Sequence, residues 1–213
     1  MSRVRPWLPI ILLLSTSGLA APKPHAIFLG QWHTVKTQDP SLARTFRIRR
    51  LIVDGRVKEY TTGVPHDVTD RLFVIERAYR LNDSLPDESA TTPHWTWQAG
   101  GWISVDRLTG HVASLNLPSF DPIVSAASWY RDYVAYCGVS DDGSKSYMMV
   151  SQLGRRKPIL KKEFSGSTCS APKWERAPSR VTFAPPDGVK ATFVVQGRSA
   201  DPTETSGQEE SQQ

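Results

Sequence analysis

The fold class is decided by residues 45–60, which read TFRIRRLIVDGRVKEY. Apolar and charged side chains alternate along residues 45–49, and successive residues of a β-strand point to opposite faces of its sheet. The dipeptide Asp54-Gly55 that follows suits the positive φ angles of a tight hairpin turn. Because residues 56–60 return as a second extended run, the segment predicts two antiparallel strands joined by this turn.

The same hairpin pattern recurs three times further along the chain. In each case an apolar or alternating run meets a turn rich in Gly, Asp or Pro, and a second run returns. The paired runs are 101–106 with 111–117, 129–139 with 147–150, and 181–183 with 189–195. Many short strands joined by such turns predict an all-β fold of antiparallel sheets, arranged as a sandwich, a barrel or a propeller-like stack.

The first 20 residues have the three-part composition of a secretory signal peptide. Two arginines give a basic start, and an apolar run spans residues 8–14. The small residues Gly18 and Ala20 occupy the two positions that a signal peptidase recognises at its cleavage site. A membrane-spanning helix needs about 20 apolar residues, far more than this run contains. We therefore expect cleavage after residue 20 or 21, delivery to the periplasm or the cell exterior, and no transmembrane anchor after cleavage.

Removal of this leader leaves residues 21–213, for which we expect a single β-rich domain over 21–197. Residues 198–213 consist mostly of Ser, Gln, Glu, Thr and Pro, a composition that predicts a disordered C-terminal tail. The mature chain carries a net charge of +3, because the leader removes two of the 26 basic residues and none of the 21 acidic ones. So mild an excess does not predict nucleic-acid binding.

Cys137 and Cys169 are the only cysteines, and both lie in the mature chain. In an oxidising compartment such a pair predicts a disulfide. The bond would close a loop of about 30 residues and contribute roughly 3–4 kcal/mol on the loop-entropy account. Two buried free thiols are the alternative. No histidine stands near either cysteine at ligand spacing, so we expect no metal site there.

Four motifs stand out in the middle of the chain. They are GGWISVDRLTG (100–110), SWYRDY (128–133), GVSDDG (138–143) and QLGRRKP (152–158). Together they resemble an uncharacterised family of exported bacterial proteins, and the resemblance covers residues 51–160 and implies no particular activity. The hairpins within 101–153 also resemble, more weakly, the blades of β-propellers, which have about four or more blades.

His66, Asp67 and Asp70 stand in a polar segment between predicted strands. An imidazole beside two carboxylates is suited to acid–base chemistry or to a divalent ion. The alternative is a turn in which an aspartate accepts hydrogen bonds from backbone amides. We favour the turn, because no serine or cysteine nucleophile motif completes a catalytic set.

Trp95, Trp97 and Trp102 lie close together in the sequence, on either side of a Gly-Gly pair. Trp95 and Trp97 are two residues apart and share a face of a strand, so their indoles are suited to forming a platform for a sugar or a peptide. A corner of the core is the alternative that we favour, because each indole has a large apolar area to bury.

Arg155 and Arg156, together with Lys157, Lys161 and Lys162, form the densest basic cluster. Such a cluster is suited to the anionic headgroups or phosphates of an envelope surface. Charged strand faces that discourage edge-to-edge aggregation are the alternative.

Strands and turns are plentiful in the sequence, whereas no nucleophile motif, metal-ligand cluster or phosphate-binding loop appears. We therefore expect a non-catalytic envelope protein that binds or scaffolds through its sheets and loops, without a cofactor. Its expected partner is an envelope protein, a peptide or a glycan. A hydrolase that uses His66, Asp67 and Asp70 is the rival hypothesis, and a structural component of an envelope assembly is the third.

Overall fold

A computed structural model describes residues 24–37, 46–82, 93–166, 169–177, 179–186 and 189–203. Within those ranges every regular element is a β-strand, and the strands pair antiparallel in three sheets. The all-β prediction is therefore confirmed. The described residues contain no helix that is long and apolar enough to cross a membrane. The predicted leader, residues 1–20, lies outside the described ranges.

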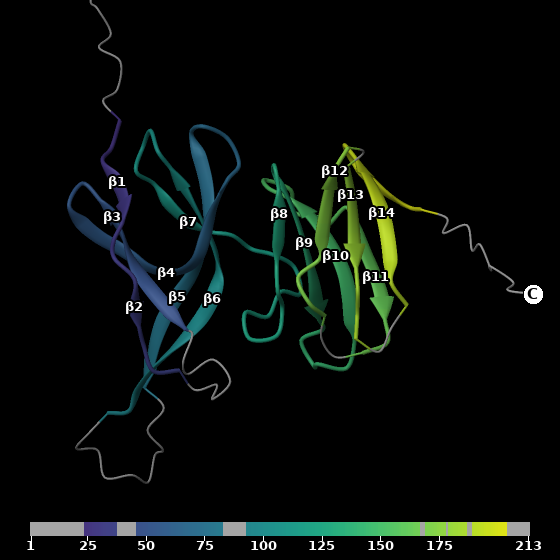
Figure 1. Ribbon diagram of the computed structural model, residues 1–213, viewed down its shortest axis with the longest axis horizontal. Helices are drawn as coiled ribbons and strands as arrows, with labels where there is room; N and C mark the ends of the chain where they lie inside the picture. Colours follow the sequence, from purple (N-terminus) through teal and green to yellow (C-terminus); the bar gives the residue numbers. More distant parts are fainter. Residues whose placement is uncertain are drawn as a thin grey trace, which may run out of the picture.

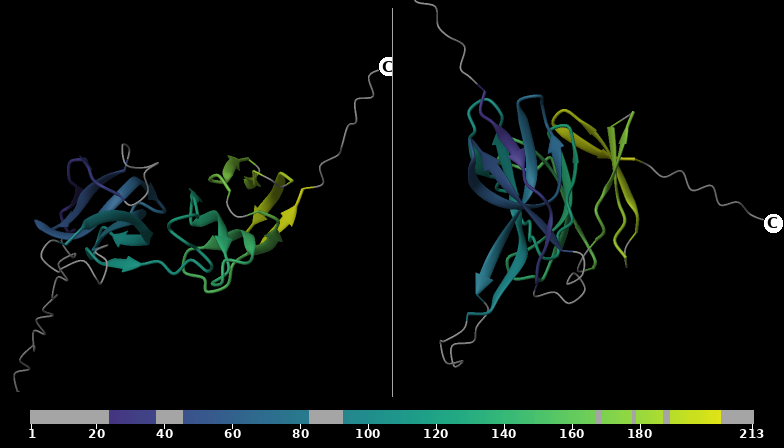
Figure 2. Two further views of the ribbon diagram at one scale, coloured as in Figure 1. Left: turned by 90° about the horizontal axis from the view of Figure 1, so that it is seen from below. Right: turned by 60° about the vertical axis from the view of Figure 1, so that its left-hand side comes forward.

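The strands gather in two bodies that lie side by side and are joined by the chain that follows β7 (Figures 1 and 2). The first body is one sheet in the order β1-β3-β4-β5-β6-β7, with β2 also paired to β3. Its strands are β1 (Ile27–Leu29), β2 (His33–Thr34), β3 (Arg47–Val53), β4 (Arg56–Asp67), β5 (Leu72–Asn82), β6 (Trp95–Asp106) and β7 (Val112–Ser114). The single domain over 21–197 stays a prediction.

β3 and β4 are the two strands of the hairpin that the sequence predicts. Asp54 (φ 51°) and Gly55 (φ 76°) both have positive φ, as the central residues of a type I′ turn require. Val53 pairs with Arg56 directly across this turn. The predicted hairpin and its turn geometry are confirmed. The predicted end of the second strand at residue 60 is wrong, because β4 continues to Asp67 and places His66 and Asp67 in a strand rather than between strands.

The first sheet curls around two buried apolar clusters. One consists of Leu51, Phe73, Ile75, Ile103 and Val105. The other is centred on Phe46, Ile48 and Ala78. At this second cluster the amide of Trp97 donates a hydrogen bond to the carbonyl of Lys36 at 2.8 Å. The segment after β2 thus reaches β6 and covers the cluster.

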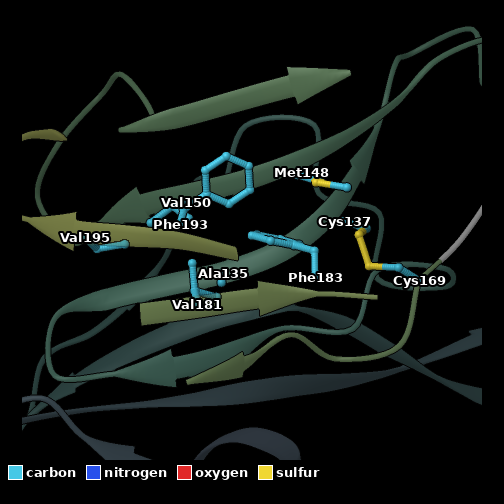
Figure 3. Close-up of a cluster of buried hydrophobic side chains, with 9 residues drawn as sticks. All are labelled: Ala135, Cys137, Met148, Val150, Cys169, Val181, Phe183, Phe193 and Val195. Atoms are coloured by element: carbon cyan, nitrogen blue, oxygen red, sulfur yellow. A yellow bond between two sulfur atoms is a disulfide. The ribbon is translucent and has the colours of Figure 1, made fainter. Parts of the chain in front are cut away.

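The second body consists of two four-stranded sheets, ordered β11-β10-β9-β8 and β12-β13-β14-β15. Their strands are β8 (Ser128–Tyr130), β9 (Tyr133–Val139), β10 (Ser146–Gln152), β11 (Leu160–Phe164), β12 (Lys173–Arg176), β13 (Ser179–Phe183), β14 (Ala191–Gln196) and β15 (Ser199–Pro202). Side chains from β9 and β10 meet those from β13 and β14 in one buried cluster (Figure 3). The two sheets therefore form a small sandwich.

Cys137 and Cys169 form a disulfide at the end of this cluster, with their Cα atoms 5.9 Å apart (Figure 3). The bond ties β9 of one sheet to the segment that leads into β12 of the other. The predicted disulfide is confirmed. A disulfide of this kind fits an oxidising, extracytoplasmic compartment.

The segment that connects the two bodies covers the other face of β9 and β10. The predicted return strand over 111–117 ends already at Ser114, and Leu117 packs instead against a buried cluster of Val134, Tyr136 and Met149. Because β9 is covered on both faces, its residues are apolar almost throughout rather than alternating.

The predicted start of the disordered tail, after residue 197, is wrong. Residues 199–202 form β15, in which Ala200 pairs with Val195 of β14 and packs against the core of the sandwich. The composition of residues 198–213 did not predict this strand, because its backbone hydrogen bonds to β14 require few apolar side chains. Residues 204–213 of the predicted tail lie outside the described ranges.

We expect Gly138→Ala to lower the free energy of unfolding by about 1–3 kcal/mol, the usual cost of overpacking a core. A Cβ at Gly138 would lie 2.6 Å from the carbonyl oxygen of Ser119. That oxygen also accepts a hydrogen bond from the amide of Val139 at 2.8 Å, which holds the connecting segment close to β9.

Urea unfolding of Gly138→Ala and of Gly101→Ala measures this effect against a matched control. Gly101 also lies in a strand, but a Cβ there would meet nothing within 4 Å. An unchanged midpoint for Gly138→Ala, or an equal loss in both variants, would contradict the packing account.

Candidate functional site

The two bodies touch where one face of the first sheet meets β8. Val74 and Glu76 are two residues apart in β5 and therefore point to the same face of the sheet. Val74 pairs with His66 of β4 and Glu76 pairs with Trp102 of β6, so the side chains of His66 and Trp102 share that face. The Trp129 ring lies against it, with its centroid 5.4 Å from that of Trp102 and 5.9 Å from that of His66. Residues from β4, β6 and β8 thus make the contact between the bodies.

A cleft of about 590 Å³ opens beside this contact, and we call it the interbody cleft. Its walls come from the end of β4, from β8 with the turn that follows it, and from β12. The lining residues are His66, Asp67, Val68, Ser128, Trp129, Tyr130, Arg131, Trp174 and Arg176. The volume falls in the range of small-molecule sites, about 300–1,000 Å³.

The wall formed by β8 and β12 is held together by aromatic side chains. Trp174 donates from Nε1 to the carbonyl of Ser128 at 3.0 Å, and the Tyr130 hydroxyl donates to the carbonyl of Arg176 at 3.3 Å. The rings of Tyr130 and Trp174 lie 5.5 Å apart with 30° between their planes. These contacts join the edge strands of the two sheets, and both residues are half-buried.

Arg131 occupies the turn between β8 and β9 with a φ of 53°. A positive φ is unfavourable for a residue with a side chain, and such strain gathers at functional sites. The carbonyl of Arg131 lies 2.7 Å from Nε2 of His66, and its guanidinium lies 5.4 Å from the centroid of the Tyr130 ring. The turn therefore fixes both the imidazole and a cation at the cleft.

The cleft carries an excess of positive charge. Asp67 is the acidic residue among the residues that line the cleft. Its Oδ1 forms an ion pair at 2.5 Å with Arg107, which is not a lining residue. Arg131 and Arg176 are exposed, and neither forms an ion pair with any carboxylate in the part of the chain that the structure describes. The lining therefore contains two guanidinium groups without a carboxylate partner in the described structure and a carboxylate that Arg107 neutralises.

The three residues predicted for acid–base chemistry lie at this end of the first body, but His66 contacts Arg131 whereas Asp67 and Asp70 both contact Arg107. A carbonyl oxygen can only accept, so Nε2 of His66 carries the hydrogen that it donates to Arg131. Asp67 pairs with Arg107, which also donates to the backbone carbonyl of Asp70 at 3.2 Å. Of the two ring nitrogens of His66, Nδ1 is the one not engaged by this hydrogen bond. The acid–base role stays a prediction.

The three tryptophans predicted as a platform are spread along β6. Trp95 is 44 % exposed at the start of the strand, under the guanidinium of Arg80. Trp97 packs edge-on against Tyr60, with the ring centroids 4.9 Å apart, beside the second buried cluster. Trp102 lies at the contact between the bodies. Trp102 is thus separated from Trp95 and approaches the cleft, which neither Trp95 nor Trp97 lines. The platform of Trp95 and Trp97 stays a prediction.

Arg155 and Arg156 lie elsewhere, in the turn after β10. They are exposed and line a separate cavity of about 440 Å³ beside the connecting segment. No residue of this cavity lines the interbody cleft. The two arginines therefore serve as a control for charge at the cleft.

Trp129, Tyr130 and Trp174 were not among the candidates from the sequence. Their signal is the SWYRDY motif, in which two aromatic residues precede a two-residue turn. Trp174 is separated from that motif by about 40 residues, and it reaches the cleft because the edge strands β8 and β12 of the two sheets lie against each other. Among the described residues no group of three or more His, Cys, Asp or Glu side chains is placed to hold a metal ion.

Glu76 is the one largely buried carboxyl on the described face of the first sheet that meets β8. Burial raises the pKa of Glu76 from 4.5 to about 7, because the charged form loses its hydration. A carboxyl group whose pKa is raised on folding contributes its full stabilisation only when the pH lies below its ordinary pKa. This stability is lost as the pH rises from 4.5 through about 7.

We therefore expect Glu76→Gln to raise the free energy of unfolding by about 1–3 kcal/mol near pH 8, and to change it little near pH 4. Thermal or urea unfolding across this pH range measures the difference. Glu175→Gln, at an exposed position on β12, is the matched control. A Glu76→Gln variant that is less stable than the wild type near pH 8 would show that the ionised carboxylate has a stabilising partner.

The chain matches no family model, no curated protein and no solved structure. The resemblance to a family of exported bacterial proteins therefore stays a prediction. The function has to be inferred from the cleft itself.

Proposed function

We propose that this is an exported, non-catalytic binding protein whose ligand occupies the interbody cleft. Export is supported by the leader-like residues 1–20 and by the disulfide, which suits an oxidising compartment. The observation that carries the binding role is the cleft's lining. Half-buried aromatic rings and two arginines without a carboxylate partner in the described structure line it from separate strands of the sandwich, opposite the end of β4.

The composition of this lining is that of a recognition site. Ligand sites combine apolar, aromatic surface with a few polar groups that fix orientation. The aromatic surface here comes from Trp129, Tyr130 and Trp174. The polar groups come from Arg131 and His66. Because Nε2 of His66 is hydrogen-bonded to the backbone carbonyl of Arg131, the imidazole is oriented before any ligand arrives.

A hydrolase that uses His66 is the alternative, since His66 lines the cleft. Catalysis by a histidine base usually relies on a partner that orients the imidazole and on a nearby nucleophile. The partners of His66 in the described structure are a backbone carbonyl and the Trp129 ring. This environment favours a positioning role for the imidazole over a catalytic one.

The binding role is tested by a thermal-shift screen of the mature protein against saccharides, peptides and anionic lipids, with each hit recovered and weighed by mass spectrometry. We expect one class to raise the melting temperature, to be recovered unchanged, and to lose its effect in Arg131→Ala. A hit that is cleaved by the wild type but not by His66→Ala, with equal melting curves, would replace binding with hydrolysis.

A further inference from the structure

We infer that the interbody cleft takes an acidic saccharide, a chain of sugar rings that carries carboxylate groups. This inference rests on the proposed binding function and names the class of its ligand. Three features of the cleft point to it: the uncompensated arginines, the half-buried aromatic rings, and the occupied backbone edge between β8 and β12.

The arginines select for negative charge. Arg131 and Arg176 stand on opposite sheets of the sandwich, one in the turn after β8 and the other at the end of β12. A guanidinium presents a planar set of donors that matches a carboxylate in two hydrogen bonds. With Asp67 already paired to Arg107, a neutral ligand would leave both cations uncompensated, whereas an acidic ligand would pair with them.

The aromatic rings select for a ligand with flat, apolar faces and polar rims. Trp129, Tyr130 and Trp174 are each half-buried, so part of every ring faces the cleft. The C–H face of a sugar ring packs on such a surface, while its hydroxyl groups remain free to bond polar neighbours. Simple inorganic anions would pair with the arginines but would leave this aromatic surface exposed to water.

The backbone of the cleft argues against a peptide that binds as an added strand. Strand addition requires free main-chain groups along an exposed edge. On the edges of β8 and β12 the carbonyls of Ser128 and Arg176 already accept hydrogen bonds from Trp174 and Tyr130. The ladder that an extended peptide would need is therefore interrupted, and recognition falls to side chains.

The test measures the affinity of the mature protein for uronate trisaccharides of galacto, gluco and manno configuration by calorimetry. Neutral trisaccharides of the same configurations and an acidic tripeptide of equal charge are the comparison ligands. We expect one uronate to bind at least about tenfold more tightly than its neutral counterpart, and the preference to shrink at high salt, since salt screens exposed charges.

Two double variants remove the same charge at different places. Arg131→Ala with Arg176→Ala should weaken uronate binding at least about tenfold, because charged hydrogen bonds are lost. Arg155→Ala with Arg156→Ala removes equal charge at the separate cavity and should leave the affinity unchanged. All four residues are exposed, and the melting temperature of each variant confirms that it folds.

The outcomes separate this inference from the binding function on which it rests. Equal affinity for acidic and neutral trisaccharides, or a preference for the acidic tripeptide, would overturn the acidic saccharide as the ligand class. The binding function would still be upheld if that affinity were lost in the Arg131→Ala, Arg176→Ala variant. Uronate binding that is lost only with Arg155 and Arg156 would move the site away from the cleft and overturn both. No binding of any uronate would overturn the ligand class alone.

Discussion

Replacement of both Cys137 and Cys169 by alanine is expected to lower the free energy of unfolding by roughly 3–4 kcal/mol. The residues are 32 positions apart, and the bond restricts that loop in the unfolded chain. For a chain of this size the loss corresponds to a drop in melting temperature of about 6–16 °C. Unfolding by urea and by heat, with and without reductant, measures the effect.

The disulfide also joins the two sheets of the sandwich at the end of their shared core. Treating the wild type with reductant should therefore approach the stability of the double alanine variant, and reductant should leave the variant itself unchanged. A double variant as stable as the oxidised wild type would show that the packing of β9 against β13 and β14 holds the sheets without the bond.

Trp129→Ala is expected to have the second-largest effect, lowering the free energy of unfolding by about 3 kcal/mol and loosening the two bodies. Truncating a buried tryptophan to alanine typically costs about 3–5 kcal/mol, and Trp129 is half-buried. Its ring is the surface on which Trp102 and His66 of the first body lie. Without it the bodies should move more freely about the connecting segment.

Denaturant unfolding gives the stability of this variant, and small-angle scattering gives its radius of gyration, which should increase. Trp95→Ala is the matched control, because Trp95 is 44 % exposed and contacts Arg80 of the first body. An unchanged scattering curve for Trp129→Ala would contradict its role in joining the bodies.

The local elements of the fold could be predicted because each is specified by neighbouring residues. The alternation over 45–49 and the turn at Asp54-Gly55 define their hairpin without reference to the rest of the chain. β15 was missed for the opposite reason. Its hydrogen bonds to β14 depend on a strand that is already in place, and its composition gives no sign of burial.

The geometry of a strand separates Trp102 from Trp95, whereas the platform of Trp95 and Trp97 stays a prediction. A strand rises about 3.3 Å per residue, so the step of seven positions from Trp95 to Trp102 places those residues roughly 20 Å apart along β6. The two ends of the strand therefore meet different surroundings: Arg80 at one end and Trp129 at the other.

The interbody cleft could not be predicted because it depends on contacts between distant segments. His66 and Arg131 are 65 residues apart, and the Trp174 ring of one sheet reaches Ser128 at the edge of the other. No periodicity or spacing encodes such an approach. The positive φ of Arg131 also has no counterpart in the sequence, since glycine or asparagine would be expected at that turn.

The most direct test of the cleft as the binding site is the ¹H–¹⁵N spectrum of the tryptophan indoles during titration of the mature protein with the uronate trisaccharides. The predicted leader contains one of the seven tryptophans, so we expect six indole signals from residues 21–213. We expect the Trp129 and Trp174 signals to move, while those of Trp32 and Trp95 stay in place. Movement confined to Trp32 or Trp95 would contradict the account.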